Sequence, residues 1–201
     1  MADDPARPYH HGNLRTALLQ RAEEVLAADG VDGLSLRGIA RDVGVSHAAP
    51  RRHFADRQAL LDALAEAGFV RLREELDAAA SRPASGFAQR FVHVALAYVG
   101  FATERAALLD VMFAGKHRPD AAASLLAAGA RAFEAPLAVV AAGQAAGEVV
   151  AGDPEGVATA SWAAIHGLAA LANAGLLDRA ALPGLVEVAV ERLVLGLRPR
   201  D

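Results

Sequence analysis

Apolar residues in the first 80 positions recur at steps of three and four, which is the period of a helix with one buried face. Ser35 and Asp56 stand where a helix N-cap is expected, and Gly44 can adopt the left-handed conformation that often ends a helix. These signals predict four helices, over residues 13–28, 34–43, 46–54 and 57–80. The third is short, basic and poor in apolar residues, so we expect its outer face to stay free of core contacts.

A stretch rich in Ser, Pro and Gly at residues 81–86 interrupts the pattern, and helical periodicity resumes beyond it. Further helices are expected over residues 87–102, 105–114, 120–145, 154–175 and 182–197. Because no run alternates with the period of a β-strand, the sequence predicts an all-α fold. The helix over residues 57–80 is long enough to join two parts of the protein, and we divide the chain into residues 9–70 and 71–201.

Charge is unevenly distributed along the chain, and this distribution suggests a different partner than the net charge does. The net charge of −4 argues against a nucleic-acid partner. Residues 35–57, however, hold five arginines and two aspartates, whereas residues 58–201 hold 12 basic and 16 acidic side chains. Positive charge concentrated in one short segment of an otherwise acidic protein is what a DNA-facing surface requires.

Residues 34–54 combine two short helices with a tight turn that contains glycine, which is the arrangement of a helix-turn-helix. The first helix buries one face to hold the second, and the second keeps its outer face free to enter a major groove. We expect DNA contacts from Arg37, Ser46, His47, Ala48, Arg51, Arg52 and Arg57. Arg37 either reaches a phosphate or pairs with a nearby acid, and His47 contacts either a base edge or a phosphate. His53 is expected to pack beside Phe54 and anchor the helix.

The segment over residues 9–61, YHHGNLRTALL…GVDGLSLRGIARDVGVSHAAPRRHFADRQALL, resembles the DNA-binding domain of the TetR/AcrR family of regulators. The resemblance includes the first-helix pattern, the LSLR and GVS motifs around the turn, and the HF pair that closes the recognition helix. It implies a two-fold dimer that binds a palindromic operator and is released when a ligand fills the C-terminal domain. Residues 161–177, SWAAIHGLAALANAGLL, resemble the Trp-His-Gly signature of one subfamily of C-terminal domains in this family.

Arg51 differs from the residue that the family resemblance predicts, and Pro50 is unusual for a helical segment. Arg51 stands where the family usually has an aromatic residue, most often Tyr, against the DNA backbone. An arginine can still bind phosphate, although the contact geometry differs. Pro50 is unusual inside a helix, but as the fourth residue after Ser46 it is expected to remove only a first-turn hydrogen bond.

The bulkiest side chains of the C-terminal part either fill a core that alanine leaves thin or line an apolar ligand cavity. The candidate ligand-binding residues are His93, Tyr98, Phe101, Met112, Phe113, Phe133, Trp162 and His166. Trp162 and His166 are four residues apart and so share one helical face. His166 either forms the inner edge of a pocket or orders its helix from the interior.

The last two predicted helices are the candidate dimer interface, because two apolar helices from each subunit can form a four-helix bundle. The apolar positions expected in the interface on the last helix are Leu182, Leu185, Val186, Val190, Leu193, Val194 and Leu197.

Several other classes of protein are disfavoured. The chain has no cysteine, and it shows no nucleophile–base arrangement, phosphate loop or paired-histidine metal spacing. We therefore expect no enzyme, no cofactor and no metal, and the adjacent His10 and His11 lack a third ligand. Residues 157–177 carry no formal charge, but polar side chains interrupt them and no basic flank marks an orientation, so a buried helix is expected rather than a membrane span. The acidic, polar first 12 residues do not resemble a signal peptide, which favours a cytoplasmic protein.

The sequence therefore predicts a DNA-binding transcriptional regulator, a homodimeric repressor that a small, partly apolar ligand releases from its operator. Its partners would be double-stranded operator DNA and a small-molecule effector, with no membrane. The alternative is a helical protein-interaction module whose DNA-binding domain no longer binds specifically.

Overall fold

A computed structural model describes residues 11–198, with side chains from residue 14 onward, and its regular elements are all helical. The α-helices are α1 (His11–Asp29), α2 (Leu36–Val43), α3 (Arg57–Ala80), α4 (Phe87–Glu104), α5 (Ala106–Lys116), α6 (Ala123–Ala132), α7 (Glu134–Ala145), α8 (Pro154–Asn173) and α9 (Leu182–Leu197). Short 3₁₀ turns occur at η1 (Val31–Gly33), η2 (Pro50–Arg52) and η3 (Arg179–Ala181). Residues 11–198 contain no strand, and the all-α prediction is confirmed.

The N-terminal helices begin and end at the residues whose chemistry predicts it. The hydroxyl of Ser35 accepts a hydrogen bond from the Gly38 N–H at 3.1 Å and caps α2. The carboxylate of Asp56 does the same for α3, accepting from the Ala59 N–H at 2.8 Å. Gly44 ends α2 with φ 76°, a conformation that a side chain would strain.

The helix expected over residues 120–145 is two helices, α6 and α7, that meet at Phe133. Pro136 explains the break, because it has no N–H to donate to the carbonyl of Ala132 and its ring crowds that carbonyl. Phe133 instead bonds back to the carbonyl of Ala130 with 3₁₀ spacing. This break places the aromatic ring of Phe133 at the corner between the two helices.

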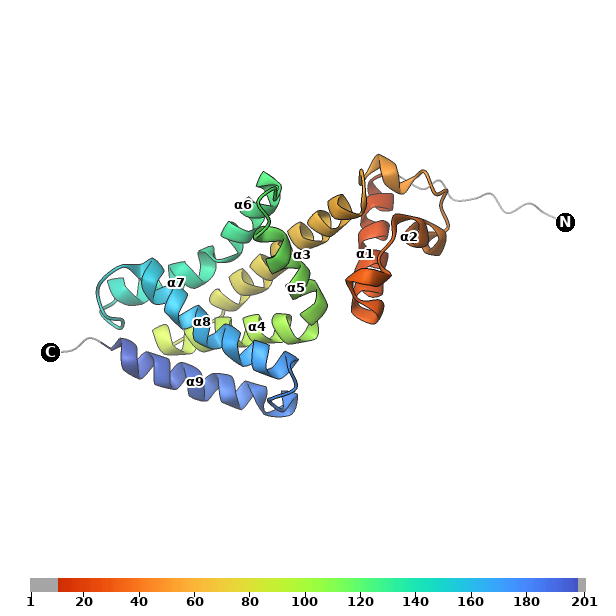
Figure 1. The fold of residues 1–201 in the computed structure, drawn as a ribbon. Helices are drawn as coiled ribbons and strands as arrows, with labels where there is room; N and C mark the ends of the chain where they lie inside the picture. The colour runs from red at the N-terminus through yellow and green to blue at the C-terminus, as the bar shows by residue number, and fades with distance from the viewer. Residues whose placement is uncertain (1–10, 199–201) are drawn as a thin grey trace, which may run out of the picture.

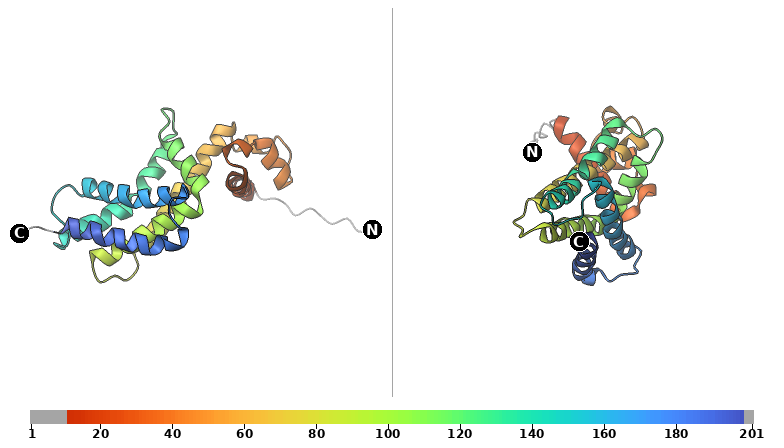
Figure 2. Two further views of the ribbon diagram at one scale, coloured as in Figure 1. Left: turned by 60° about the horizontal axis from the view of Figure 1, so that its bottom comes forward. Right: turned by 90° about the vertical axis from the view of Figure 1, so that its left-hand side faces the viewer.

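Helix α3 connects the two ends of the molecule (Figure 1). Its N-terminal part packs with α1, and the rest runs into a bundle in which it contacts α4, α5, α6 and α7. Helices α8 and α9 lie beside α4 on the far side of that bundle (Figures 1 and 2). Leu60, Phe69, Leu72 and Leu76 are fully buried along α3, so one apolar core continues from the N-terminal helices into the bundle.

One stretch of the described residues is long and apolar enough to cross a membrane, Ala123–Ala145, and the bent pair α4 and α5 would be a second if it counted as one span. Core helices pass the same test of length and composition, so one or two such segments are weak evidence for a membrane protein. Here α6 and α7 are separated at Phe133 and pack on α3, while α4 and α5 meet at 99°. Their packing fits a helical core.

Candidate DNA-binding and ligand-binding sites

The segment expected to be the recognition helix, residues 46–54 (the recognition segment), is not an α-helix. It forms turns followed by the 3₁₀ turn η2, and the Ala49 N–H bonds to the carbonyl of Ser46 with i to i+3 spacing. Pro50 has no N–H to donate to that same carbonyl and its ring crowds it, so an α-helical turn cannot form there. The expectation that Pro50 removes only one first-turn bond was wrong, because this segment is too short to absorb the loss.

The recognition segment is nevertheless fixed to the core. Pro50 is buried, and Phe54 is 2% exposed at the end of the segment. The ring of His53 lies 6.3 Å from that of Phe54, centroid to centroid, in agreement with the expected packing. The guanidinium of Arg15 on α1 lies 5.7 Å from the Phe54 ring centroid. Two buried anchors thus hold the segment, while Ser46, His47, Ala48, Arg51 and Arg52 are exposed.

All seven predicted DNA-binding residues are exposed: Arg37, Ser46, His47, Ala48, Arg51, Arg52 and Arg57. Within residues 14–198, Arg37, Arg51 and Arg52 have no ion-pair or hydrogen-bond partner. A cluster of exposed guanidinium groups without intramolecular carboxylates keeps its charge available for phosphate oxygens. Arg37 has no acid partner in the described residues, so the pairing that the sequence left open for it is not formed there.

Arg57 differs from the expectation, because its guanidinium forms hydrogen bonds within the protein. Nε donates to the carbonyl of Leu34 at 3.0 Å, and an Nη donates to the carbonyl of Val31. A weaker ion pair joins it to Asp32 at 3.9 Å. Arg57 therefore ties the start of α3 to the turn before α2. The sequence could not show this, since the carbonyls that it binds belong to main chain 23 and 26 residues earlier.

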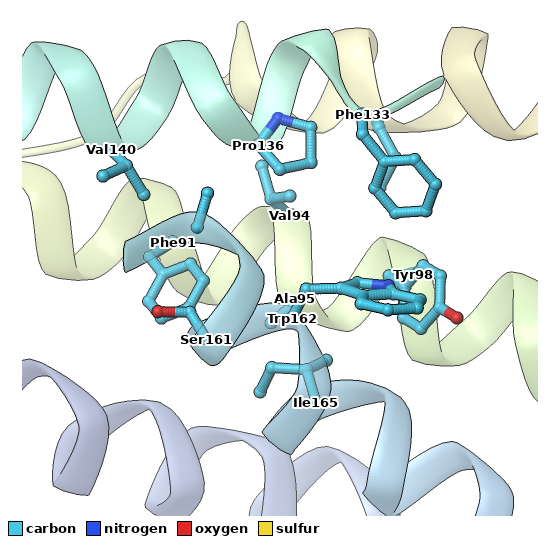
Figure 3. Close-up of a pocket in the computed structure, with 12 residues that line it drawn as sticks. Phe91, Val94, Ala95, Tyr98, Phe133, Pro136, Val140, Ser161, Trp162 and Ile165 are labelled. Atoms are coloured by element: carbon cyan, nitrogen blue, oxygen red, sulfur yellow. The ribbon is translucent and has the colours of Figure 1, made fainter. Parts of the chain in front are cut away.

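A small cavity lies in the bundle between α3, α4, α7 and α8 (Figure 3). This inner cavity has a volume of about 30 Å³, close to the space that one water molecule takes in the liquid. Its walls are almost entirely apolar and include Phe91, Tyr98, Phe133, Trp162 and Ile165. Ser161 is the buried polar residue among them.

A larger cleft opens on the other side of Phe133 and Trp162. This outer cleft has a volume of about 490 Å³ and is lined by residues from the end of α5, from α6 and α7, and from the first half of α8. Its lining residues are Phe113, Lys116, His117, Ala130, Phe133, Glu134, Pro136, Leu137, Glu155, Ala158, Thr159 and Trp162. Phe133, Pro136, Ala158 and Trp162 line both spaces, and the rings of Phe133 and Trp162 are the aromatic part of the wall between them.

The wall belongs to a connected set of aromatic rings. Trp162 makes an edge-to-face contact with Phe133, with centroids 5.2 Å apart, and stacks on His166 at 5.0 Å. Phe113 contacts both Trp162 and His166, at 6.0 and 5.6 Å. The hydroxyl of Tyr98 lies 2.7 Å from Nδ1 of His166. A displacement of any one ring would therefore disturb its neighbours.

Burial sets the protonation of the Tyr98–His166 pair. Burial raises the pKa of Tyr98, and it lowers the pKa of His166 below its usual value. Both groups are therefore neutral at pH 7, and their contact is a hydrogen bond between neutral partners. His166 lines neither cavity, and its hydrogen bond with Tyr98 joins α8 to α4.

The predicted ligand residues divide into two groups. Tyr98, Phe113, Phe133 and Trp162 line at least one of the two spaces, whereas His93, Phe101, Met112 and His166 line neither. Met112 is fully buried against α3, where a Cβ on Gly68 would lie 2.6 Å from its sulfur. Phe101 is packed in the core with the guanidinium of Arg105 5.0 Å from its ring centroid. His93 lies off the face of α4 that carries the cavity-lining residues.

Sequence analysis missed several lining residues, including Phe91, Lys116, Pro136, Glu155 and Ser161. Phe91 was recoverable, because it lies seven positions before Tyr98 and hence on the same helical face. Pro136 carried a helix-breaking signal that marks the corner at Phe133. Lys116 and Glu155 come from helices that meet only in the tertiary fold.

Family models match both parts of the chain. Residues 18–64 match the bacterial regulatory proteins of the tetR family, and residues 91–197 match the tetracyclin repressor-like C-terminal domain. The chain belongs to the TetR family. Members of this family are DNA-binding transcriptional regulators and not enzymes. No curated protein matches the chain significantly.

Several solved structures are similar to this chain over 90% or more of its length. A protein of unknown function from Rhodococcus sp. RHA1 is 47% identical, with a TM-score of 0.90 over 96% of this chain and 100% of that one. The TetR family transcriptional regulator PfmR from Thermus thermophilus is 16% identical, with a TM-score of 0.69 over 90% and 99%. A bacterial regulatory protein in the tetR family from Rhodococcus RHA1 is 21% identical, with a TM-score of 0.70 over 92% and 97%. At these lower identities the likeness concerns the fold.

In the described part of this TetR-family chain, no group of three or more potential metal ligands comes together. His10 lies outside the described residues, as does the side chain of His11, so this pair is not tested.

Proposed function

We propose that this TetR-family protein is a repressor that binds a palindromic operator as a homodimer and leaves it when a small, partly apolar molecule occupies the C-terminal domain. The observation that carries the proposal is the set of exposed arginines without acid partners: Arg37 on α2, and Arg51 and Arg52 on the recognition segment that buried Pro50 and Phe54 anchor. An anchored, positively charged surface can meet DNA without first breaking ion pairs. Arg51 would contact phosphate where the family usually has an aromatic residue.

The dimer interface is proposed on α8 and α9. Leu171, Val188 and Leu195 are exposed large apolar residues there, and Leu176 between the two helices is 71% exposed. Of the interface positions predicted from the sequence, Leu182, Val186 and Val190 are buried inside the protomer, whereas the other four are half-buried: Leu185, Leu193, Val194 and Leu197. Covering the exposed set with the same set of a second copy would remove that apolar surface from water.

Close approach of the helices across that interface is also sterically open. A Cβ added at Gly167 on α8, or at Gly184 or Gly196 on α9, would meet no atom within 4 Å. These glycines are therefore not required by packing within the protomer. We propose that they let helices of two protomers approach closely, and that Trp162, His166 and Gly167 form the Trp-His-Gly signature of the C-terminal subfamily.

A route from cleft to DNA-binding helices is proposed through the corner between α5 and α6. Arg118 in this corner donates to Asp62 of α3 at 2.7 Å, and Ser124 donates to Glu66 of α3 at 2.9 Å. Both acids lie in the first half of α3, close to the N-terminal helices. The same corner follows directly on Lys116 and His117 of the outer cleft.

Release then follows from linkage. A ligand that moves the corner would shift α3 and hence the distance between the two recognition segments of the dimer, which DNA fixes at about one helical turn, roughly 34 Å. Two such states, one favoured by DNA and one by ligand, oppose each other thermodynamically. In this scheme the functional division of the chain, residues 9–70 and 71–201, falls within α3, and residues 9 and 10 lie outside the described residues.

The direct test is binding of the purified protein to the intergenic DNA beside its own gene, with excess nonspecific competitor and at two salt concentrations. Specific binding by a dimer that weakens with salt is the expected result. Absence of specific binding at low salt would contradict the proposal and favour an interaction module with a disabled DNA-binding domain. A bound ligand that leaves operator affinity unchanged would contradict the sensing half alone.

A further inference from the structure

We infer that the ligand of the outer cleft is a planar aromatic carboxylate, bound with its ring against Phe133 and Trp162 and its carboxylate on Lys116. This inference rests on the proposed sensing function and names the chemical class of the effector.

The walls of the cleft suit a flat ring. Phe113, Phe133 and Trp162 all line it, with ring centroids between 5.2 and 6.0 Å apart where they contact one another. Rings at these spacings already pack edge to face or tilted, and a further aromatic ring adds contacts of the same kind. An aliphatic ligand would bury apolar area but would not gain these ring contacts.

Two hydrogen-bond donors at this wall, on Lys116 and Trp162, form no hydrogen bond of normal length within the protein. Nε1 of Trp162 is buried and has only a weak, longer contact with the hydroxyl of Tyr98 among the described residues. An unpaired buried N–H costs free energy that an acceptor on a ligand would recover. Lys116 is partly buried in the cleft and has no carboxylate partner within residues 14–198. Its Nζ lies 5.7 Å from the ring centroid of Phe133, so the ammonium is held beside the same wall.

The two acids of the cleft do not call for a cationic ligand. Glu134 lies 3.7 Å from the guanidinium of Arg73 on α3, and Glu155 is exposed in the first turn of α8, where the helix dipole stabilises a negative charge. Nδ1 of His117 is not free to bind an anion, because it is hydrogen-bonded to the carbonyl of Phe113 at 2.7 Å. Of the donors in the cleft without a normal hydrogen bond in the described residues, Trp162 and the exposed hydroxyl of Thr159 are neutral, and Lys116 carries the charge that favours an oxygen anion.

Size decides where the ring lies. The inner cavity, at about 30 Å³, holds no organic molecule, whereas the outer cleft, at about 490 Å³, does. The ring therefore stacks on the cleft side of the wall.

Three probes with one ring and different head groups test the inference: trans-cinnamate, cinnamyl alcohol and cinnamylammonium. Trp162 is the only tryptophan of the chain, so its fluorescence reports binding at the wall itself. The excitation wavelength is set longer than the wavelengths that the probes absorb. Calorimetry on the full-length protein gives the dissociation constants independently. We expect cinnamate to bind roughly tenfold more tightly than cinnamyl alcohol, with cinnamylammonium the weakest.

Lys116→Met keeps the length and apolar stem of the side chain and removes its charge. This variant is expected to bind cinnamate and cinnamyl alcohol equally. Arg131→Met is the matched control, because Arg131 is an exposed cation on α6 that lines neither the inner cavity nor the outer cleft. The control should keep the parental preference. Trp162→Phe should weaken both oxygen-bearing probes while retaining the order between them.

Three results with the parent protein would each overturn the inference. These are equal affinities for the three probes, tightest binding of the ammonium probe, or no binding at up to roughly 5 mM. So would an unchanged preference in Lys116→Met. None of these results touches operator binding, which the intergenic DNA assay measures without a ligand. Failure of that assay would contradict the proposed function whichever probe binds the cleft.

Discussion

The DNA-binding region and the sensing region of this protein arrange their chemical groups in opposite ways. In the recognition segment the charged side chains are exposed and unpaired, and only Pro50 and Phe54 enter the core. In the sensing region the aromatic groups contact one another, and the unpaired polar atoms are buried. The two ends of α3 therefore present surfaces of different kinds.

The difference shows what each partner demands. DNA is a large polyanion that stays in water, so a binding surface gains most from exposed charge that no intramolecular acid neutralises. A small molecule must be taken out of water, so its site needs apolar walls and a few donors placed where the ligand provides the acceptor. Each region can be altered separately, and the contrast between them can be tested.

The largest effect is expected from removing exposed charge in the recognition segment. The double variant Arg51→Ala, Arg52→Ala should lower operator affinity roughly 100-fold at low salt and reduce the salt slope by about two, because two phosphate contacts are lost. Binding titrations over a salt series measure both quantities. Cinnamate binding should not change, since neither arginine lies near the cleft.

Arg82→Ala is the matched control for this double variant. Arg82 is exposed and unpaired in the described residues, but it lies between α3 and α4. An equal loss of operator affinity in the control, or an unchanged salt slope in the double variant, would show that the recognition segment is assigned to the wrong residues.

Arg57 should behave differently from Arg51 and Arg52, although all three lie in the same basic segment. Arg57→Ala removes hydrogen bonds to the carbonyls of Leu34 and Val31, and we expect it to lower the free energy of unfolding by about 1 to 2 kcal/mol. Chemical denaturation measures this loss. The salt slope of operator binding should stay at the parental value, and a slope reduced by about one would instead return Arg57 to the DNA contacts.

A change at the corner should separate the two regions without damaging either. Arg118→Ala breaks the bond to Asp62, so we expect the ligand-induced loss of operator affinity to shrink about fivefold, which is about 1 kcal/mol of coupling. Operator binding without ligand and ligand binding without operator are the two controls, and both should remain parental. Arg179→Ala removes an exposed arginine far from the corner and should leave the coupling intact. Full ligand response in Arg118→Ala would mean that the signal takes another path.

Most of the fold was predictable because its signals are local. The caps at Ser35 and Asp56 and the left-handed Gly44 set helix ends through atoms at most three or four residues away. Both errors in helix assignment come from proline: Pro50 turned a predicted helix into a 3₁₀ turn, and Pro136 divided another at Phe133. Pro50 disrupts more than its own hydrogen bond because its segment is short, and the break at Pro136 was not predicted.

The sites were less predictable because they depend on distant contacts. Arg57 and Arg52 are both arginines in a basic segment, and only the main-chain carbonyls near Arg57 distinguish them. Met112 and Phe113 are neighbours in sequence, yet Met112 packs against α3 while Phe113 lines the outer cleft. Composition identifies the bulky residues of the sensing region, but their direction depends on which helix packs against which face.

The smallest expected effect is on the pH dependence of stability, and it tests the burial of His166 in the sensing region. Burial lowers the pKa of His166, so at pH values below the unfolded pKa of about 6.5 the unfolded chain binds a proton that the folded chain does not. Stability is therefore fully present above that pKa and falls as the pH drops toward the folded value. Denaturation at pH 7 and pH 5 should show a smaller loss in His166→Gln than in the parent, since glutamine does not titrate. His47→Gln, on an exposed residue of the recognition segment, is the control and should keep the parental loss. Equal losses in His166→Gln and the parent would mean that the Tyr98–His166 contact is not as desolvated as its position among the aromatic rings indicates.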